Sequence, residues 1–236
     1  MFHQVRSLPR VFLPWVDLDE PLELPRKEYE KFRKVLRLVN GDRIAVLPND
    51  GSLIVGKLQG PHVVFVEKVF PDSEPKSKLT LVQALPKADK LDTIIRMCTE
   101  VGVSHFVLFP SDRSVLKWEG PKLEDRLGRY RSIAREAAEQ SFRSLMPTVE
   151  FGHSLAGVLQ IYPNSIVLSE VEGLSRQLKP PFVENPVLVI GPEGGWSPRE
   201  LDLVGDKGVT LGPRVLRADT AGPIAAALVL LSYFEA

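Results

Sequence analysis

The stretch Val187-Leu-Val-Ile-Gly-Pro-Glu-Gly-Gly-Trp-Ser-Pro-Arg-Glu200 decides the fold of this chain. Its four leading apolar residues predict a buried strand. Glycines and a proline then break the strand, because Gly permits a positive φ and Pro has no N–H. Residues 197–200 predict a helix start, with Ser197 at the N-cap, Pro198 at N1 and Glu200 at N3 of a capping box. This order is typical of a ligand loop at the carboxyl edge of an α/β sheet.

The glycine loop 191–195 favours a neutral or cationic ligand. Its glycine spacing fits neither the dinucleotide fingerprint nor the phosphate-binding P-loop. Glu193 at its centre repels a phosphate, and Ser197 and Glu200 already use the helix-end donors that a phosphate needs. On this loop alone, an ordinary glycine turn without a ligand remains the alternative.

A second segment, 209–221, has the same organisation: a short strand, a Gly-Pro break and a polar cluster that opens an apolar helix. Together the two segments closely resemble the paired signature of the RsmE family, G-P-E-G-G-aromatic-S-x-x-E and L-G-x-R-[IV]-L-R-x-[ED]-T-A. Met97 departs from the family pattern, which has a basic residue there. Further matching segments extend the resemblance over nearly the whole chain: Arg10–Phe12, Val35–Asp42, Lys87–Val103, Ser111–Val115 and Glu136–Pro147.

This resemblance implies both a fold and an activity. RsmE proteins belong to the SPOUT superfamily and use S-adenosyl-L-methionine to methylate N3 of one uridine in bacterial 16S ribosomal RNA. The implied fold is α/β, with a C-terminal SPOUT-type domain that contains a deep trefoil knot and a small N-terminal PUA-like β-barrel that binds RNA. The implied partners are 16S rRNA, within the small ribosomal subunit, and a second copy of the chain in a homodimer.

Two other functions remain open at this point. The first is methylation of another RNA position, such as a ribose 2′-hydroxyl, by the same kind of enzyme. The second is a non-catalytic RNA-binding factor in ribosome assembly. The intact loop 191–195 and Arg217 argue against the second.

The cofactor carries a sulfonium cation and an uncharged adenine. Bare glycine backbone can contact adenine, and Leu211, Val215 and Leu216 can supply apolar walls. For Leu168, Ile190 and Val215, an ordinary place in the core is the alternative. The family correspondence and these arguments give the following expected cofactor-binding residues: Leu168, Ser169, Glu170, Ile190, Gly191, Pro192, Glu193, Gly194, Gly195, Leu211, Gly212, Val215, Leu216, Arg217 and Thr220.

Arg217 and Glu193 are the candidate catalytic residues. Uridine N3 carries a proton, and its loss places negative charge on O2 and O4 of the ring, which a fixed cation stabilises. Arg stays protonated at any working pH, so Arg217 is a charge stabiliser and an unsuitable base. Glu193 is the weaker candidate, as the proton acceptor. Alternatively, Arg217 pairs with Asp219 and only shapes the loop.

Net charge is zero, but the charge is unevenly distributed. Residues 76–147 contain 13 basic and 9 acidic residues, whereas residues 148–236 contain 6 and 10. The segment Arg26–Arg37 has six basic residues, although for a charge run alone a solvated helix face is the favoured explanation. Each arginine alone also suits a surface ion pair. The arginines expected to contact RNA are Arg10, Arg33, Arg37, Arg113 and Arg143.

Strand and turn patterns predict two domains. Residues 1–70 contain short strands over 42–47, 52–58 and 62–70, and the first two flank the hairpin turn Asn49-Asp-Gly51. A helix is expected over 26–38 and a polar linker over 71–78. Residues 79–236 alternate strands with helices, which predicts a largely parallel sheet with helices on both faces. The last helix, about 221–234, is apolar on nearly all sides.

Composition excludes several other classes. Cys98 is the only cysteine, so no internal disulfide is possible, and its place in a helix favours a buried hydrophobe over a nucleophile. His3, His62, His105 and His153 make no metal-ligand spacing, so no metal is expected. The chain has no apolar run long enough for a bilayer and no signal peptide at its start. These features predict a cytoplasmic protein.

Overall fold

The computed structural model describes residues 5–14, 16, 22–87, 90–115, 118, 120, 122–152, 154–170 and 176–233. The chain divides into a smaller unit, 1–74 with 138–146, and a larger unit, 75–137 with 147–236. The division after Glu74 falls within the segment 71–78 expected to be a linker. Residues 138–146 were expected in the C-terminal domain, but they belong to the smaller unit.

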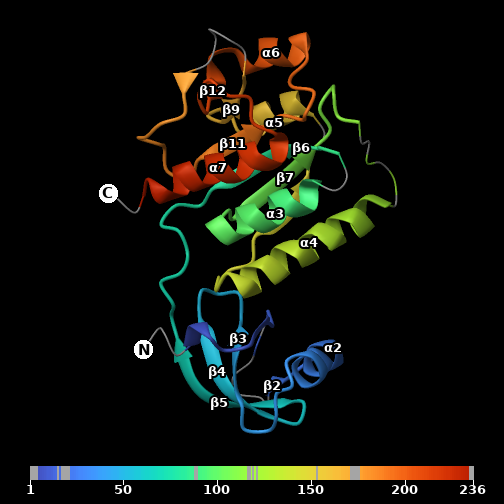
Figure 1. Ribbon diagram of the computed structural model, residues 1–236, viewed down its shortest axis with the longest axis vertical. Coiled ribbons are helices and arrows are strands. Elements are labelled where there is room, and N and C mark those ends of the chain that lie inside the picture. The colour runs from blue at the N-terminus through green and yellow to red at the C-terminus, as the bar shows by residue number, and fades with distance from the viewer. Residues whose placement is uncertain are drawn as a thin grey trace. The chain divides into compact units, whose positions relative to one another are not determined.

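A seven-stranded sheet forms the centre of the larger unit, and all its neighbouring strands are parallel (Figure 1). The strand order is β10-β12-β9-β11-β6-β7-β8. The predicted α/β class with a parallel sheet is therefore confirmed. The strands are β6 (Thr80–Ala84), β7 (His105–Phe109), β8 (Thr148–Phe151), β9 (Ile166–Leu168), β10 (Arg176–Gln177), β11 (Val187–Ile190) and β12 (Gly208–Thr210).

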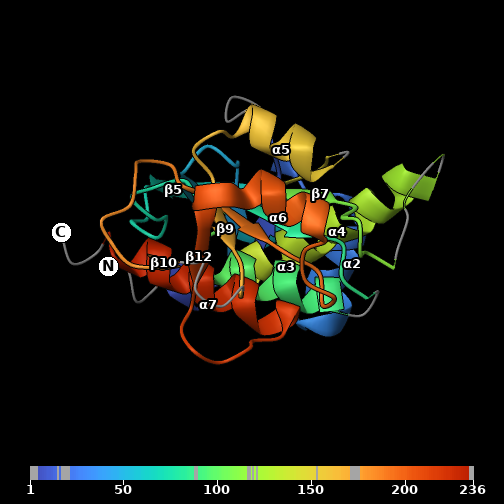
Figure 2. The ribbon, with the colours of Figure 1, turned by 90° about the horizontal axis from the view of Figure 1, so that it is seen from above.

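Helices cover both faces of this sheet, as Figure 2 shows. On β7, Phe106 and Leu108 belong to one hydrophobic cluster, whereas Val107 and Phe109 belong to the other, because successive side chains of a strand point to opposite faces. The first cluster includes residues of α3 (Lys90–Val101), α4 (Lys122–Gln140) and α7 (Ala218–Leu231). The second includes residues of α5 (Leu155–Ile161) and α6 (Pro198–Val204), the latter followed by the turn η2 (Gly205–Lys207).

Two features of these helices bear on the sequence predictions. Cys98 is fully buried on α3, and burial raises the pKa of its thiol, so its predicted role as a core residue is confirmed. Helix α7 begins at Ala218, earlier than the expected residue 221, because Arg217 is its extended N-cap and Arg217 O accepts the N–H groups of Thr220 and Ala221. Residues 88–89, which directly precede α3, lie outside the described residues.

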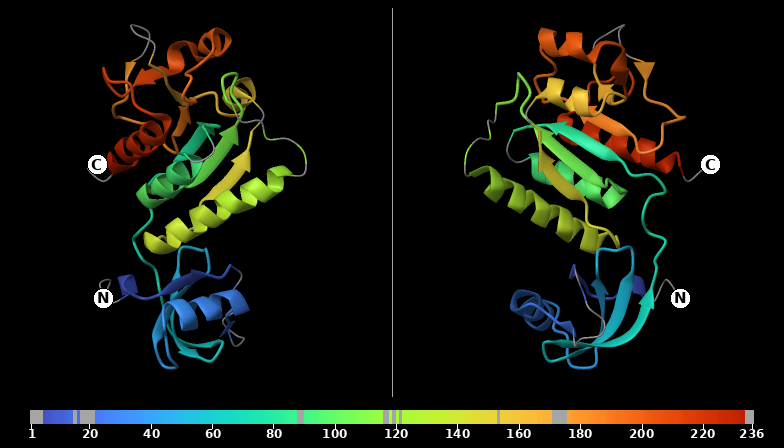
Figure 3. Two further views of the ribbon diagram at one scale, coloured as in Figure 1. Left: turned by 45° about the vertical axis from the view of Figure 1, so that its right-hand side comes forward. Right: turned by 180° about the vertical axis from the view of Figure 1, so that it is seen from behind.

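The smaller unit contains a five-stranded sheet of order β1-β3-β4-β5-β2 (Figure 3). Strands β1 and β3 are parallel, and the other neighbours are antiparallel. The helix expected over 26–38 forms as α2 (Arg26–Glu30) and a π-helical turn η1 (Lys31–Val35). The strands are β1 (Arg10–Phe12), β2 (Leu22–Glu23), β3 (Arg43–Leu47), β4 (Leu53–Gln59) and β5 (His62–Val69).

The β3–β4 hairpin forms at the predicted turn. Asn49 has a φ of 68° and Gly51 a φ of 87°, the left-handed conformations that Asn and Gly tolerate best. The Asp50 carboxylate accepts hydrogen bonds from the hydroxyl and backbone N–H of Ser52, which lower the pKa of Asp50. These bonds fix the turn and thereby the register of the hairpin.

Glu74 holds the segment 143–145 within the smaller unit. Its Oε2 lies 2.8 Å from Nη2 of the buried Arg143 and 3.2 Å from Nε of the same side chain. Its Oε1 accepts the backbone N–H groups of Ser144 at 2.8 Å and Leu145 at 3.1 Å. A chain segment remote in sequence thus belongs to this unit because one carboxylate binds it at several donors.

We expect Glu74→Ala to lower the free energy of unfolding by about 3 kcal/mol, because losing one partner of a buried ion pair leaves buried donors poorly compensated. Urea unfolding followed by circular dichroism measures the change. The matched control is Asp72→Ala, since Asp72 is exposed on the same segment, and it should stay within about 0.5 kcal/mol of the parent. Equal stability of the two variants would contradict this role of Glu74.

Candidate functional site

A pocket of about 590 Å³ lies where β9, β11 and β12 end in the larger unit. Such a volume is in the range of small-molecule and cofactor sites. The glycine loop and the second predicted segment both line it, so the structure brings together most of the expected cofactor residues. These are Leu168, Ser169, Glu170, Ile190, Gly191, Pro192, Glu193, Gly195, Leu211, Val215, Leu216 and Arg217.

Three expected residues do not line the pocket. Gly194 is exposed, and its carbonyl accepts a hydrogen bond from Arg113. Gly212, with a φ of 118°, exchanges hydrogen bonds with the side chain of Thr210. Thr220 is half-buried in the first turn of α7. Val215 does line the pocket, but it is 84% exposed, so it lies at the rim and is no enclosed apolar wall.

The lining also includes residues that were expected to bind neither the cofactor nor RNA. Lys90 is the only charged one among them, and it belongs to the matched segment 87–103. Most of the others adjoin predicted residues in the chain, so chain proximity was the available signal. They are Trp196, Pro198, Leu201, Val209, Thr210, Ala218 and Ala221.

Trp196 explains why the loop needs glycine at position 191. Its indole Nε1 donates to the carbonyl of Leu168 at 2.8 Å, and its ring stacks on Phe109. A Cβ on Gly191 would lie 3.1 Å from this ring, which is closer than side chains ordinarily approach. The indole therefore joins the ends of β9 and β11, and a side chain at position 191 would have to displace the ring by a few tenths of an ångström.

The predicted capping box of α6 is confirmed and has a further contact. Ser197 Oγ accepts the N–H of Glu200 at 3.1 Å, and Glu200 Oε2 accepts the N–H of Ser197 at 2.9 Å. Glu200 is buried, and its Oε1 also accepts the N–H of Asp112 at 3.0 Å. Ser197 Oγ in turn donates to Asp112 Oδ2 at 2.6 Å. The cap of α6 thus fastens the loop after β7 to the loop after β11.

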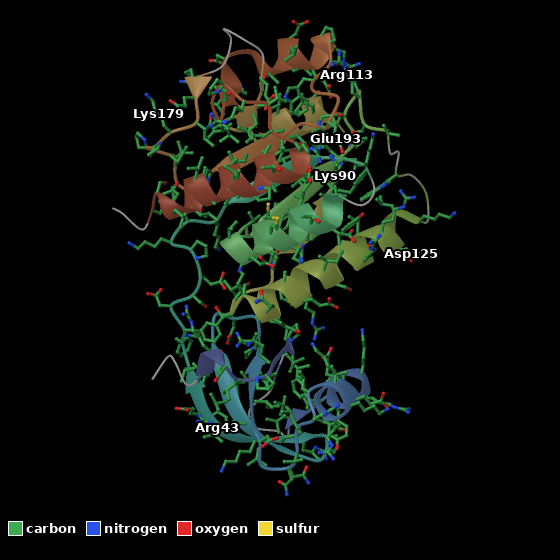
Figure 4. The ribbon with its side chains drawn as sticks, viewed as in Figure 1. Arg43, Lys90, Arg113, Asp125, Lys179 and Glu193 are labelled. Atoms are coloured by element: carbon green, nitrogen blue, oxygen red, sulfur yellow. The ribbon has the colours of Figure 1, made fainter. Side chains whose placement is uncertain are left out.

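The loop after β7 carries Arg113 to the pocket. Arg113 Nη1 donates to the carbonyl of Gly194 at 2.8 Å, and its side chain is labelled in Figure 4. On the same loop, Ser114 Oγ donates to the carbonyl of Leu85 at 2.9 Å, just after β6. These bonds place an arginine beside the glycine loop and lining the pocket.

Lys90 connects the two loops that the sequence motifs marked. Its Nζ lies 3.3 Å from Glu193 Oε1 and 3.4 Å from Asp219 Oδ1. Glu193 Oε1 also accepts the backbone N–H of Lys87 at 3.1 Å. Burial by itself lowers the pKa of Lys90, but the hydrogen bonds and charges of Glu193 and Asp219 outweigh it and raise the pKa of Lys90. Lys90 is therefore a fixed positive charge and an unsuitable base.

Arg217 is exposed as the N-cap residue of α7 and lines the pocket. Within the described residues its guanidinium has no salt-bridge partner. The ion pair of Asp219 is with Lys90, so the alternative in which Arg217 pairs with Asp219 has no support in the structure. Glu170 Oε1 accepts the N–H of Leu216 at 3.0 Å, which ties the end of β9 to the loop that carries Arg217.

The other arginines expected to contact RNA lie in the smaller unit and differ in exposure. Arg33 and Arg37 are exposed, and Arg37 adopts a positive φ of 58°. Arg10 is half-buried over the ring of Phe142, and burial lowers its pKa. Arg143 is buried in its ion pair with Glu74, so the expectation that it contacts RNA is corrected. A guanidinium that is 3% exposed and held by Glu74 is not available to a phosphate at the surface.

Two features are absent from the described residues. No cluster of three or more His, Cys, Asp or Glu side chains there is arranged to hold a metal ion. No helix within the same ranges has the length and apolar character needed to cross a membrane. His3 and His153 lie outside the described residues.

Known proteins resemble both the sequence and the structure of this chain. A family model described as "RNA methyltransferase domain" matches residues 73–230. Ribosomal RNA small subunit methyltransferase E of Bacillus subtilis is 34% identical over 214 residues, which cover 83% of this chain and 84% of that protein. The protein of the same name from Synechocystis sp. is 33% identical over 238 residues, covering 93% and 76% respectively.

Among solved structures, this chain resembles ribosomal RNA small subunit methyltransferase E from Neisseria gonorrhoeae. That structure has S-adenosyl methionine bound. The two share 25% sequence identity with a TM-score of 0.83, over 94% of this chain and 96% of the other. The likeness therefore includes both units of the chain.

The contacts of Glu200 predict the effect of replacing it. Glu200→Gln keeps one acceptor oxygen but turns an NH₂ group toward the N–H of Asp112 or Ser197, so one buried donor loses its acceptor. We expect the free energy of unfolding to fall by about 1–3 kcal/mol in urea titrations. Asp202→Asn, an exposed change on the same helix, is the control and should have no effect above about 0.5 kcal/mol. If Glu200→Gln is as stable as this control, the bridge contributes nothing.

Proposed function

The chain belongs to the ribosomal RNA small subunit methyltransferase E family, and we propose on that basis that it transfers a methyl group from S-adenosyl-L-methionine to N3 of a uridine in 16S ribosomal RNA. The observation that carries the proposal is the pocket itself. The two segments that resemble the family signature converge on it from β11 and β12, the two strands that flank β9 in the sheet. The matched domain is common to enzymes that act on different RNA positions, so the choice of uridine N3 rests on the family resemblance of the two signature segments.

The pocket suits this cofactor in size and charge. Its glycine loop offers bare backbone, which can hydrogen-bond the edge of an adenine, and Leu211 and Leu216 are half-buried at its wall. Charged side chains of both signs line it, Glu170 and Glu193 together with Lys90, Arg113 and Arg217, and this suits a cofactor with a sulfonium cation and a zwitterionic amino-acid end. When bound, the cofactor supplies an electrophilic methyl group on its sulfonium sulfur. The residues proposed to hold it are those expected from the sequence, with Gly194, Gly212 and Thr220 shaping the loops from outside the pocket.

Arg217 is proposed to stabilise the reactive form of the base. The uridine must lose its N3 proton before N3 can accept a methyl group, and the anion places charge on O2 and O4. An exposed guanidinium without an ion-pair partner among the described residues is able to turn toward that charge. Charge stabilisation of this kind is often a large contribution to catalysis.

Glu193 is the proposed proton acceptor. Its Oε1 is engaged by the N–H of Lys87 and the ammonium of Lys90, so Oε2 is the oxygen proposed to receive the N3 proton. Transfer then forms the N3–CH₃ bond, breaks the S–CH₃ bond and leaves S-adenosylhomocysteine, with the released proton balancing the charge. The same side chain thus has one oxygen that fixes the loop and one that faces the reaction.

For RNA binding we propose Arg10, Arg33 and Arg37 of the smaller unit and Arg113 at the pocket. The five-stranded sheet of that unit supports the proposal of a PUA-like RNA-binding barrel. Arginine suits phosphate and base edges because its planar fork donates two hydrogen bonds at once. An enzyme that acts on 16S rRNA, within the small subunit, is proposed to work in the cytoplasm.

A trefoil knot and a homodimer complete the proposal. The adjacency of β9, β11 and β12 supports the knot, because the family resemblance implies a knot formed by two glycine loops, and these loops follow β11 and β12. Helix α7 exposes Ile224, Leu228 and Leu231, which form an i, i+4, i+7 stripe of apolar side chains. Contact of such a stripe with water is unfavourable, and an exposed apolar patch of this kind marks an interaction surface. A second copy of the chain is the proposed occupant, in a two-fold contact of the commonest kind.

Filling the glycine loop should abolish cofactor binding. Gly195 has a φ of 67° and open space where a Cβ would project, so Gly195→Trp places an indole in the pocket region. Isothermal titration calorimetry with S-adenosyl-L-methionine should detect no binding by a folded variant. Gly195→Asn is the control, since Asn tolerates a positive φ and is small, and most of the affinity should persist. Undiminished affinity of the Trp variant would remove this loop from the cofactor site.

Removing the cation of Arg217 should slow methyl transfer and spare cofactor binding. We expect Arg217→Ala to lose roughly 10²–10³ in the rate constant, the usual cost of removing one charge-stabilising donor, with the cofactor Kd within a few-fold. Single-turnover transfer of radiolabelled methyl to saturating small ribosomal subunits measures this. The neighbouring Arg214→Ala is the control. An unchanged rate for Arg217→Ala would exclude it from the mechanism.

The dimer proposal predicts a particle of twice the 26.3 kDa chain mass at micromolar concentration. Leu228→Glu should convert it to a monomer, because a carboxylate in an apolar contact loses its hydration without a partner. Multi-angle light scattering reports both masses. Leu203→Glu changes an exposed leucine on α6 and should leave the dimer intact. A wild-type particle of single-chain mass would contradict the proposal.

A further inference from the structure

Lys90 is the one residue of α3 that lines the pocket. It is the first residue of that helix, and Figure 4 shows it beside Glu193. Its ammonium lies 3.3 Å from Glu193 in the glycine loop and 3.4 Å from Asp219 in the first turn of α7. One cation, at the start of a helix that packs into the core, therefore contacts carboxylates from both loops of the site.

We propose that Lys90 is a positioning residue for the cofactor site: it holds the glycine loop and the start of α7 together and neutralises their carboxylates. The inference rests on the proposed function and adds a residue to it. It concerns loop geometry and pocket charge, and Lys90 takes no part in the transfer itself.

The helix makes this role effective. Leu91, Ile94, Ile95 and Cys98 are buried in the main core of the larger unit, so α3 provides a fixed base for the Lys90 side chain. The side chain is only 24% exposed, and both ion pairs are partly sheltered from water. Partly buried pairs are screened less by salt than surface pairs are. The same two loops carry Gly191 and Arg217. The positions of these two residues in the pocket therefore depend on how Lys90 holds the loops.

The charge of the pocket changes when Lys90 is removed. Glu193 and Asp219 would face each other without their shared cation, and their repulsion would open the loops. The extra negative charge would at the same time attract a sulfonium cation. These two effects oppose each other for S-adenosyl-L-methionine, which carries a sulfonium. S-adenosylhomocysteine has a neutral thioether, so its affinity responds only to the loss of loop geometry.

The test is calorimetric titration of both ligands into the full chain carrying Lys90→Met. We expect S-adenosylhomocysteine to bind on the order of tenfold more weakly, and S-adenosyl-L-methionine to lose distinctly less affinity. Lys90→Arg keeps the charge and the reach to both carboxylates, so it should restore both affinities to within about threefold. Arg96→Met, an exposed change on the same helix, is the matched control and should alter neither ligand.

Double variants test the route of the effect. If Lys90 acts through the two carboxylates, Lys90→Met combined with Glu193→Gln should cost less than the product of the two single losses. Unchanged binding of S-adenosylhomocysteine by Lys90→Met would overturn the inference. So would an equal loss for both ligands, which a general loss of stability would cause. Wild-type protein that binds neither ligand would instead overturn the proposed function and the inference with it.

Discussion

Loops that leave the carboxyl edge of a parallel sheet have backbone N–H groups without a strand partner, and each such group needs an acceptor. In this chain glutamates supply acceptors across loops that are far apart in sequence. Three glutamates in the loops around the pocket each accept an N–H from a different segment of the chain. The geometry of the pocket therefore depends on these bonds. Glu170 accepts from Leu216, Glu193 from Lys87 and Glu200 from Asp112.

This arrangement explains how bare glycine backbone can line a pocket without collapsing. The glycine loop contributes few side chains of its own, so its position is set by its neighbours: Trp196 beneath Gly191, Arg113 on the carbonyl of Gly194 and Lys90 on Glu193. The charged side chains that hold the loops also line the pocket with charges of both signs. Structure and ligand preference thus follow from the same side chains.

The sequence was sufficient for the elements with strong local signals. The strand 187–190 and the capping box at Ser197 were predicted correctly, because apolar runs and capping residues act over a few positions. The parallel sheet followed from alternating strands and helices. The lining of the pocket by both motifs was also predictable, since carboxyl ends of parallel strands meet at one edge.

Side-chain partners far apart in sequence were not predictable. Arg143 was expected to contact RNA, but its burial depends on Glu74, which lies 69 positions earlier in the chain. In the sequence, Lys90 is one of several basic residues expected on a helix. Its position between Glu193 and Asp219 arises only when the strands assemble, so the sequence did not predict it. Periodicity places a residue on a face, but it does not say which distant carboxylate meets it.

We propose that this pocket serves methylation of N3 of a uridine in 16S ribosomal RNA. Nucleoside mass spectrometry of 16S rRNA, purified from cells with and without the gene for this chain, measures the product. We expect 3-methyluridine at one position to disappear when the gene is deleted and to return when the wild-type gene is restored. An unchanged content of 3-methyluridine, or the loss of a ribose-methylated nucleoside in its place, would contradict it.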